Sequence, residues 1–246
     1  QPAAVGETVG EKQSQPAAAS STAEPAKSKD VFVAPENVGS KDVDAARIIT
    51  VKTPLYLVRI AEAGAVFKSF ELENYKESAD KNSASKNLLD ADFNSQNMKV
   101  SLAGGGLAGL DVAVFEADEA SDTITVADTP RILTFSWQSE SGVVVEKSFT
   151  FSPESYLIDM DLVFKNGSGS GFTDRAVVEV QHVMPKTKGY AFEGPSALLN
   201  GKLEQVKIKK IEDNNRLSGS FQWLAIEDRY FMRSLIPAEP VDGEVS

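Results

Sequence analysis

Two acidic residues on one predicted strand are the first pair in this sequence that could do acid–base chemistry. Asp159 and Asp161 alternate with hydrophobic residues over 156–164. A strand with this period of two places both carboxylates on one face, about 6–7 Å apart. A working pair would need a neighbour that separates the two pKa values, and no nearby residue type does so. We interpret the two as the solvated face of a half-buried strand.

The only histidine, His182, is the next candidate for chemistry. A single histidine excludes a histidine-based metal cluster and a centre that needs several histidines. It could complete a catalytic arrangement with a serine or an aspartate, but the chain has no nucleophile-elbow sequence. General acid–base catalysis also needs a positioned partner. We therefore predict a structural role for His182.

Two motifs match ligand-binding loops in form only. Gly104 to Gly109 fits G-x-G-x-x-G, but the alternating residues of 111–115 predict a strand where a dinucleotide fingerprint needs a helix. The segment 90–94 opens like a calcium loop, yet Ser95 stands where glycine is needed and Ser101 where a bidentate glutamate is needed. The sequence predicts no catalytic, cofactor-binding or metal-binding residues.

Charge restricts the classes of partner. The formal net charge of −11 argues against a nucleic-acid surface and a polybasic membrane patch. Lys207, Lys209 and Lys210 fall in a predicted strand, 202–211, and could bind an anion. Lysines that protect a solvated edge strand from aggregation are the favoured interpretation. Because the chain has no cysteine, disulfides and thiolate zinc sites are excluded.

The chain is expected to divide into two parts. Residues 1–46 are rich in Ala, Pro, Gln and Ser, and such a composition buries too little apolar surface to offset its ordering entropy. We expect a disordered linker there, either a spacer or a processed tail, and a folded domain over 47–246. The chain begins with Gln1, its first methionine is Met98, and it has no apolar run of 18 residues. We therefore expect a soluble piece of a longer protein.

Short alternating segments dominate the rest of the chain and predict strands. Residues 73–97 and 166–171 are predicted as loops, the second joining two strands of a hairpin, and 190–195 as a turn. The strand count predicts an all-β fold, a large antiparallel β-sandwich. The predicted strands are 48–53, 55–60, 65–72, 99–102, 111–115, 123–126, 131–137, 143–151, 156–164, 176–184, 202–211, 221–226 and 230–236.

The densest aromatic and aliphatic segment is 221–237, which contains Trp223, Tyr230 and Phe231. Each of these side chains brings roughly 150–250 Å² of buriable surface. We predict two core strands joined by a Glu-Asp-Arg turn, and a core role for Trp223.

Four segments in this order resemble the periplasmic domain of the YidC membrane-protein insertases of Gram-negative bacteria. The first is Ile49–Thr53 with Gly64-Ala65-Val66 and Leu72–Tyr75, where the family usually has a second glycine in place of Ala65. The others are Lys147–Tyr156 with Asn166, Tyr190–Pro195 with Gly201–Leu203, and Trp223–Pro237.

The resemblance implies a β-supersandwich like that of galactose mutarotase, on the periplasmic side of the bacterial inner membrane. It implies a non-catalytic, accessory domain that contacts the Sec translocon through SecD and SecF, and nascent membrane proteins. Insertion itself belongs to a transmembrane groove that this chain lacks. Family members continue past Pro237 with further strands, so we expect a sandwich that lacks its last strands.

Two alternatives remain open at this point. A carbohydrate-binding or aldose-epimerase-like protein would use the same sandwich, but an epimerase needs a histidine acid and a carboxylate base at the sugar, and only His182 could serve. A generic structural or adhesion sandwich is disfavoured by the ordered motifs.

Overall fold

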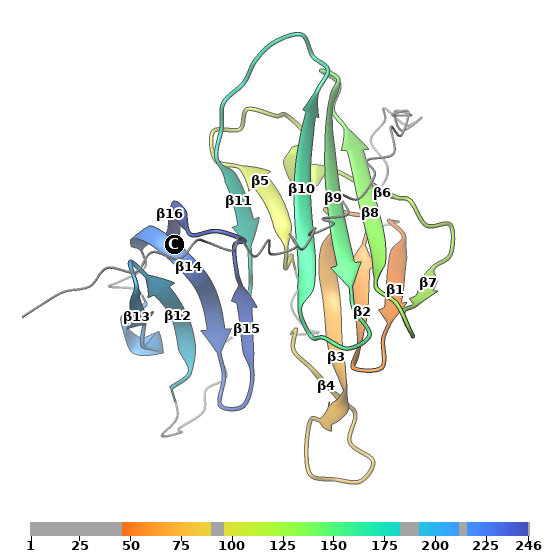
Figure 1. Cartoon of the computed structure of the whole chain (residues 1–246), viewed down its shortest axis with the longest axis vertical. Helices are drawn as coiled ribbons and strands as arrows, with labels where there is room; N and C mark the ends of the chain where they lie inside the picture. Colours follow the sequence, from red (N-terminus) through yellow and green to blue (C-terminus); the bar gives the residue numbers. More distant parts are fainter. Residues whose placement is uncertain (1–45, 90–95, 183–191, 212–215, 246) are drawn as a thin grey trace, which may run out of the picture. The chain divides into compact units, whose positions relative to one another are not determined.

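The computed structural model describes residues 46–89, 96–182, 192–211 and 216–245 of the chain. The regular secondary structure of the described residues consists almost only of β-strands, which build four sheets (Figure 1). Two short 3₁₀ helices, η1 (Leu110–Val112) and η2 (Ile208–Lys210), are the helical elements in these ranges. Within the described residues, no helix is long and apolar enough to cross a membrane. The all-β prediction is confirmed.

Sheet I has the strand order β4-β3-β2-β1-β7. β2 and β3 form a hairpin, and β1 pairs with β2. Three alternating side chains of β2, those of Tyr56, Val58 and Ile60, are fully buried. One pairing departs from the antiparallel prediction, because β7 runs parallel to β1. The bounds are β1 Ile48–Lys52, β2 Tyr56–Ala61, β3 Val66–Lys76, β4 Ser85–Asn87 and β7 Thr123–Thr125.

Sheet II has the order β10-β9-β8-β6, and its long strands agree with the predicted ones. Sheet III consists of β11 and β5. Sheet IV has the order β13-β12-β14-β15, and β16 also pairs with β14. The bounds are β5 Lys99–Leu102, β6 Glu116–Ala117, β8 Arg131–Gln138, β9 Val143–Phe151, β10 Ile158–Asn166, β11 Ala176–Glu179, β12 Gly194–Leu199, β13 Lys202–Gln205, β14 Leu217–Glu227, β15 Met232–Leu235 and β16 Val241–Val245.

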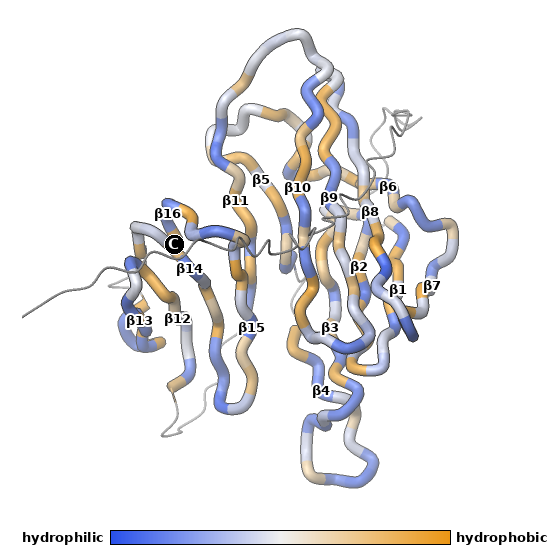
Figure 2. The backbone as a smooth tube through the Cα atoms, in the orientation of Figure 1, coloured by the Kyte–Doolittle hydropathy of each residue, from blue (hydrophilic) through white to orange (hydrophobic). Residues whose placement is uncertain are grey.

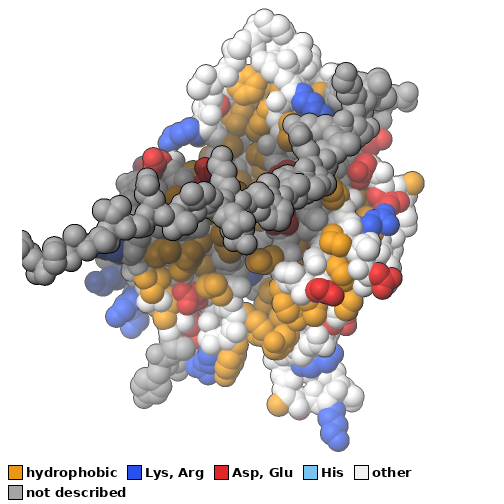
Figure 3. All heavy atoms as spheres, viewed as in Figure 1, with side chains coloured by type: hydrophobic (Ala, Val, Ile, Leu, Met, Phe, Trp, Pro, Cys, Tyr) orange, Lys and Arg blue, Asp and Glu red, His pale blue; other side chains and the backbone are white. Residues whose placement is uncertain are grey.

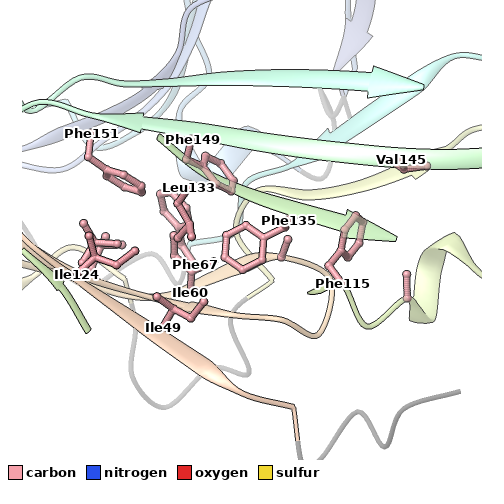
Figure 4. Close-up of a cluster of buried hydrophobic side chains, with 14 of the residues drawn as sticks. Ile49, Ile60, Phe67, Phe115, Ile124, Leu133, Phe135, Val145, Phe149 and Phe151 are labelled. Carbon is pink, nitrogen blue, oxygen red and sulfur yellow. The ribbon is translucent and has the colours of Figure 1, made fainter. Parts of the chain in front are cut away.

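The main core lies between sheets I and II. Figure 4 shows side chains from β8 and β9 pointing toward Ile49, Ile60 and Phe67 of sheet I. The ring centroids of Phe67 and Phe149 are 5.0 Å apart across this interface. Fully burying one such side chain stabilises the fold by about 1.5–3 kcal/mol. The core thus holds the two sheets together as a sandwich.

Several predicted elements are wrong, each for a local reason. The loop predicted over 73–97 is partly strand, because β3 continues to Lys76 and β4 pairs with it. The connection between them, residues 77–84, is mostly hydrophilic (Figure 2). The strand predicted over 111–115 is wrong because η1 occupies its start, where Leu110 and Ala113 are buried three residues apart.

Three further errors concern the later part of the chain. Residues 176–179 do not return beside β10, because β11 pairs with β5 of sheet III. The turn predicted over 190–195 already contains the start of β12, and 190–191 lie outside the described residues. The strand predicted over 202–211 ends at Gln205. Val206 is buried, but Ile208 opens η2 and is exposed.

Candidate functional site

Lys147 is the most unusual polar residue of the core. It lies on β9 between Val145 and Phe149, on the inward face, and its side chain is 0% exposed. Its ammonium donates hydrogen bonds to the carbonyl oxygens of Gly64 (3.2 Å) and Ala65 (2.6 Å), and to that of Met98. A buried charge is tolerated only when it is paired or hydrogen-bonded, and three carbonyl groups meet that need here.

The backbone around Lys147 is unusual in the same place. Ala65 and Met98 are non-glycine residues with positive φ, 46° and 68°. Such conformations cost free energy and persist only when the surroundings fix them. Lys147 donates hydrogen bonds to the carbonyl oxygens of both residues. It therefore joins the turn between β2 and β3 to the start of β5.

The chemistry open to Lys147 is limited by its burial. Removal from water lowers its pKa to about 7 from the ordinary 10.5, because the charged form is poorly solvated there. A lysine with a lowered pKa can be a nucleophile or a base. Here the amine has no exposed surface and is held by three acceptors, so the arrangement is structural.

The glycine-rich loop binds an anionic group of the chain itself, the side-chain carboxylate of Asp174. The carboxylate of Asp174 accepts hydrogen bonds from the backbone N–H groups of Gly104 (2.7 Å), Gly106 (2.9 Å) and Arg175 (2.7 Å). These bonds, led by that from Gly104, lower the pKa of Asp174. A Cβ atom on Gly104 or Gly106 would lie 2.9 or 2.8 Å from the Asp174 carboxylate. The two glycines are therefore needed for this contact, which links the loop before β11 to the loop after β5.

The remaining predicted residues form no catalytic arrangement in the described part of the chain. Asp159 and Asp161 are exposed on β10, which confirms the solvated face. His182 is half-buried at the end of a described range. No group of three or more potential metal-binding side chains occurs among the described residues. The calcium-like segment 90–95 lies outside them. Lys207 precedes η2, and Lys209 and Lys210 lie within it. Basic side chains gather over β13 and η2 in Figure 3.

The side chains of the segment 221–237 are less buried than the sequence predicts. Trp223 is half-buried and Tyr230 is 79% exposed, so the segment 221–237 is not the main core. Its buried cluster consists of Ala197, Leu199 and Phe221. Hydrophobic side chains remain exposed at the turn between β14 and β15 (Figure 3). Phe231 is the exception, since it packs against the main core and meets Tyr75 edge to face at 5.3 Å.

A hollow of about 270 Å³ lies beside the turn between β2 and β3. Residues from β1, β2, β3 and β5 and from η1 line it, and we call it the β1–β3 hollow. Its lining combines aliphatic side chains with Lys68, Lys99 and Asp111. Sequence reasoning missed this hollow, because its residues come from five secondary-structure elements and the loops beside them.

Comparison with known proteins decides the family. The model of the YidC periplasmic domain matches residues 48–245, which include every described strand. The chain belongs to the YidC periplasmic domain family. It is 29% identical over 213 residues to the membrane protein insertase YidC of Syntrophus aciditrophicus, covering 84% of this chain and 39% of that protein. It is 31% identical over 193 residues to that of Geobacter sulfurreducens, covering 76% and 35%. The chain thus spans little more than a third of these relatives.

The four segments that resemble the YidC periplasmic domain family occupy defined places in the fold. The first lies in β1, in the turn between β2 and β3, and in β3. The second covers β9 from Lys147 onward, the connection that follows it, and Asn166 at the end of β10. The described part of the third lies in β12 and β13, and the fourth in β14 and β15. Ala65, where the family usually has a second glycine, has a φ of 46°. This backbone conformation explains why glycine suits the position.

Proposed function

We propose that residues 47–246 are the non-catalytic periplasmic domain of an inner-membrane insertase and chaperone, and that residues 1–46 are its spacer. The observation that carries the proposal is the family match over 48–245. The curated relatives are membrane protein insertases of which this chain covers little more than a third. The domain would assist insertion and folding performed by the remainder of such a protein.

The arrangement of side chains supports a role in contact rather than in chemistry. The buried amine of Lys147 has no exposed surface, and the paired aspartates on β10 are solvated. In contrast, the segment 230–236, which contains β15, exposes Tyr230, Met232 and Ile236. Exposed apolar side chains that gather on one element are typical of protein contact surfaces. We propose that this surface meets components of the Sec translocon, SecD and SecF among them, or nascent membrane proteins.

The experiment is complementation in a bacterium depleted of its own insertase. The gene for the longer protein that contains this chain is expressed with a photo-crosslinking residue in place of Tyr230. The control carries the same residue in place of Ile132, which is exposed on β8 of sheet II. We expect growth with both variants, and crosslinks to Sec components or to nascent membrane proteins from position 230 only.

Two results would contradict the proposal. The first is failure of the unmodified longer protein to support growth although it is produced and reaches the membrane. The second is loss of growth with His182→Ala in a protein that folds normally, since this would indicate chemistry at the only histidine. Mutarotation of an aldose by the purified chain would support the epimerase alternative instead.

A further inference from the structure

Strand β10 forms one edge of sheet II and is the longest edge strand in the described part of the chain. It has 9 residues, whereas no other edge strand there has more than 5. Its register with β9 runs from Ile158 to Asn166 without a bulge, and the strand contains no proline. Natural proteins commonly protect sheet edges by shortening the strand, or with a bulge or a proline. β10 uses none of these three devices.

The outer side of this strand offers unpaired backbone groups. β10 pairs with β9 alone among the described strands. In an antiparallel pair, the N–H and C=O groups of every second residue bond the neighbouring strand, and those of the residues between them point away from it. From Ile158 to Phe164, no residue makes a hydrogen bond within the described chain other than those with β9. A further strand could therefore bond this outer side, which we call the free edge of β10.

The side chains that β10 turns toward the core are only partly covered. Met160 and Leu162 pack against the main core but stay half-buried, whereas Phe149 and Lys147, their partners on β9, are fully buried. The two strands face the same layer, and only β9 has a strand on each side. The exposed parts of Met160 and Leu162 therefore lie at the free edge. A strand added there would remove apolar surface from water, which favours association.

The outward face of β10 carries two acids without a cation. Asp159 and Asp161 are exposed, and neither has an ion pair or a hydrogen bond within the described residues. Their neighbours across the sheet, on β9 and β8, are neutral. Further along this face, Lys165 forms an ion pair with Glu146. Opposite charges on neighbouring strands stabilise the pairing and like charges destabilise it, so the two aspartates favour a strand with basic side chains.

We propose that the free edge of β10 binds an extended segment of a partner protein as an added strand, in which lysine or arginine alternates with aliphatic residues. The backbone of the segment would bond β10, its aliphatic side chains would lie beside Met160 and Leu162, and its cations would meet Asp159 and Asp161. A second copy of this chain is a poorer partner. Two antiparallel β10 strands side by side would place their aspartates on the same face, where like charges repel.

This contact is separate from the one proposed for the β14–β15 turn, because β10 belongs to sheet II. The proposal rests on the backbone, the apolar side chains and the charges of β10, and it does not depend on the insertase function. Failure of one proposal therefore leaves the other standing.

The test is a titration of the full chain, residues 1–246, with the capped hexapeptide Thr-Lys-Val-Lys-Val-Thr, followed by ¹H–¹⁵N NMR. We expect shifts of the backbone amides of Met160 and Leu162. Hydrogen exchange should slow at every second amide of β10, because the added strand protects these groups from water. Binding should weaken as salt is added, because salt screens exposed charges.

Two control peptides separate the charges from the backbone bonds. The first has Gln in place of both Lys, and we expect about tenfold weaker binding for it. The second is N-methylated at one Val and at the adjacent Lys, which removes a backbone donor from each side of the peptide. It keeps both charges, and we expect it not to slow hydrogen exchange in β10.

Variants localise the site. Asp159→Asn combined with Asp161→Asn should weaken binding of the Lys peptide by about tenfold and bring it close to the Gln peptide. Asp128→Asn is the control, since Asp128 is exposed in the loop between β7 and β8, and it should leave binding unchanged. Unfolding midpoints in urea verify that all variants are folded.

Any of three results overturns the proposal. The Lys and Gln peptides bind equally well, the double variant binds as the unmodified chain does, or hydrogen exchange in β10 does not slow at millimolar peptide. Equal slowing by the N-methylated peptide would also overturn strand addition. Slower exchange of the same amides as the concentration of the chain alone is raised would assign the edge to a second copy instead of a partner.

Discussion

The cluster between sheets I and II and the cluster on sheet IV use the same kinds of side chain in different environments. The first buries Tyr56, Phe135 and Phe149 completely. The second buries Ala197, Leu199 and Phe221, while Trp223 stays half-buried and Tyr230 exposed. Hydrophobic character therefore does not set burial in this protein. A side chain becomes core only where a second layer faces it.

This comparison predicts a gradient of stability effects. Phe149→Ala should have the largest effect and lower the free energy of unfolding by about 3–5 kcal/mol, because it leaves a cavity beside Phe67 and Phe135. Urea denaturation of the purified chain, followed by tryptophan fluorescence, measures the change. A loss below about 1 kcal/mol would show that this core readily collapses around the cavity.

Lys147→Met tests the polar part of the same core. Methionine keeps much of the packing but leaves the carbonyl oxygens of Gly64, Ala65 and Met98 without their buried donor. We expect a loss of about 2–3 kcal/mol at neutral pH. An unchanged or higher unfolding midpoint would mean that the cost of burying the amine exceeds the value of its three bonds.

The pH dependence of stability should also depend on Lys147. Its pKa is about 7 in the folded chain and 10.5 when solvated. Between these values the unfolded state binds more protons, so the free energy of unfolding should rise with pH across this window. Below the lower value both states are protonated, and the cost of the buried charge is fully present. Urea midpoints from about pH 6 to pH 9.5 should rise in the unmodified chain more than in Lys147→Met; parallel curves would refute the assignment.

Trp223→Ala tests sheet IV. Because Trp223 is half-buried, we expect a loss of about 1–2 kcal/mol, well below that of Phe149→Ala. Circular dichroism in urea measures it, since the fluorescence of Trp223 is removed. A loss equal to that of Phe149→Ala would abolish the distinction between the two clusters.

Tyr230→Ser should have the smallest effect on stability. The side chain is 79% exposed, so the free energy of unfolding should change by no more than about 0.5 kcal/mol. In the proposed insertase, the same variant should weaken crosslinking of the β14–β15 turn to the proposed partner. A large loss of stability would indicate that Tyr230 packs within the domain.

The strands of sheets I and II could be predicted well because their pattern is local. In β9, alternation places Val143, Val145, Phe149 and Phe151 on one face, and all four are buried. The same alternation placed Lys147 on that face, but a lysine is seldom buried, and its partners Gly64, Ala65 and Met98 lie far away in the sequence. The alternation of the strand therefore indicates that Lys147 is buried, but it does not indicate which groups accept its hydrogen bonds.

The errors arose where a distant segment decides the outcome. The loop after β10 leads to β11, which pairs with β5 rather than with β10. Asp174 attaches this loop to the backbone of Gly104 and Gly106. No short-range pattern reveals this pairing. The β1–β3 hollow likewise depends on a bulge at Lys68 and on η1, neither of which alternation predicts.

The sequence by itself determined the all-β class, the positions of most long strands and the family, because side-chain alternation and motif order are properties of neighbouring residues. The tertiary structure decided which strands pair across the chain, which apolar face is covered and where a buried lysine finds its acceptors. Those outcomes depend on groups that are distant in sequence and meet only after folding. For this reason Phe149 is core and Tyr230 is surface, although both are aromatic residues in hydrophobic segments.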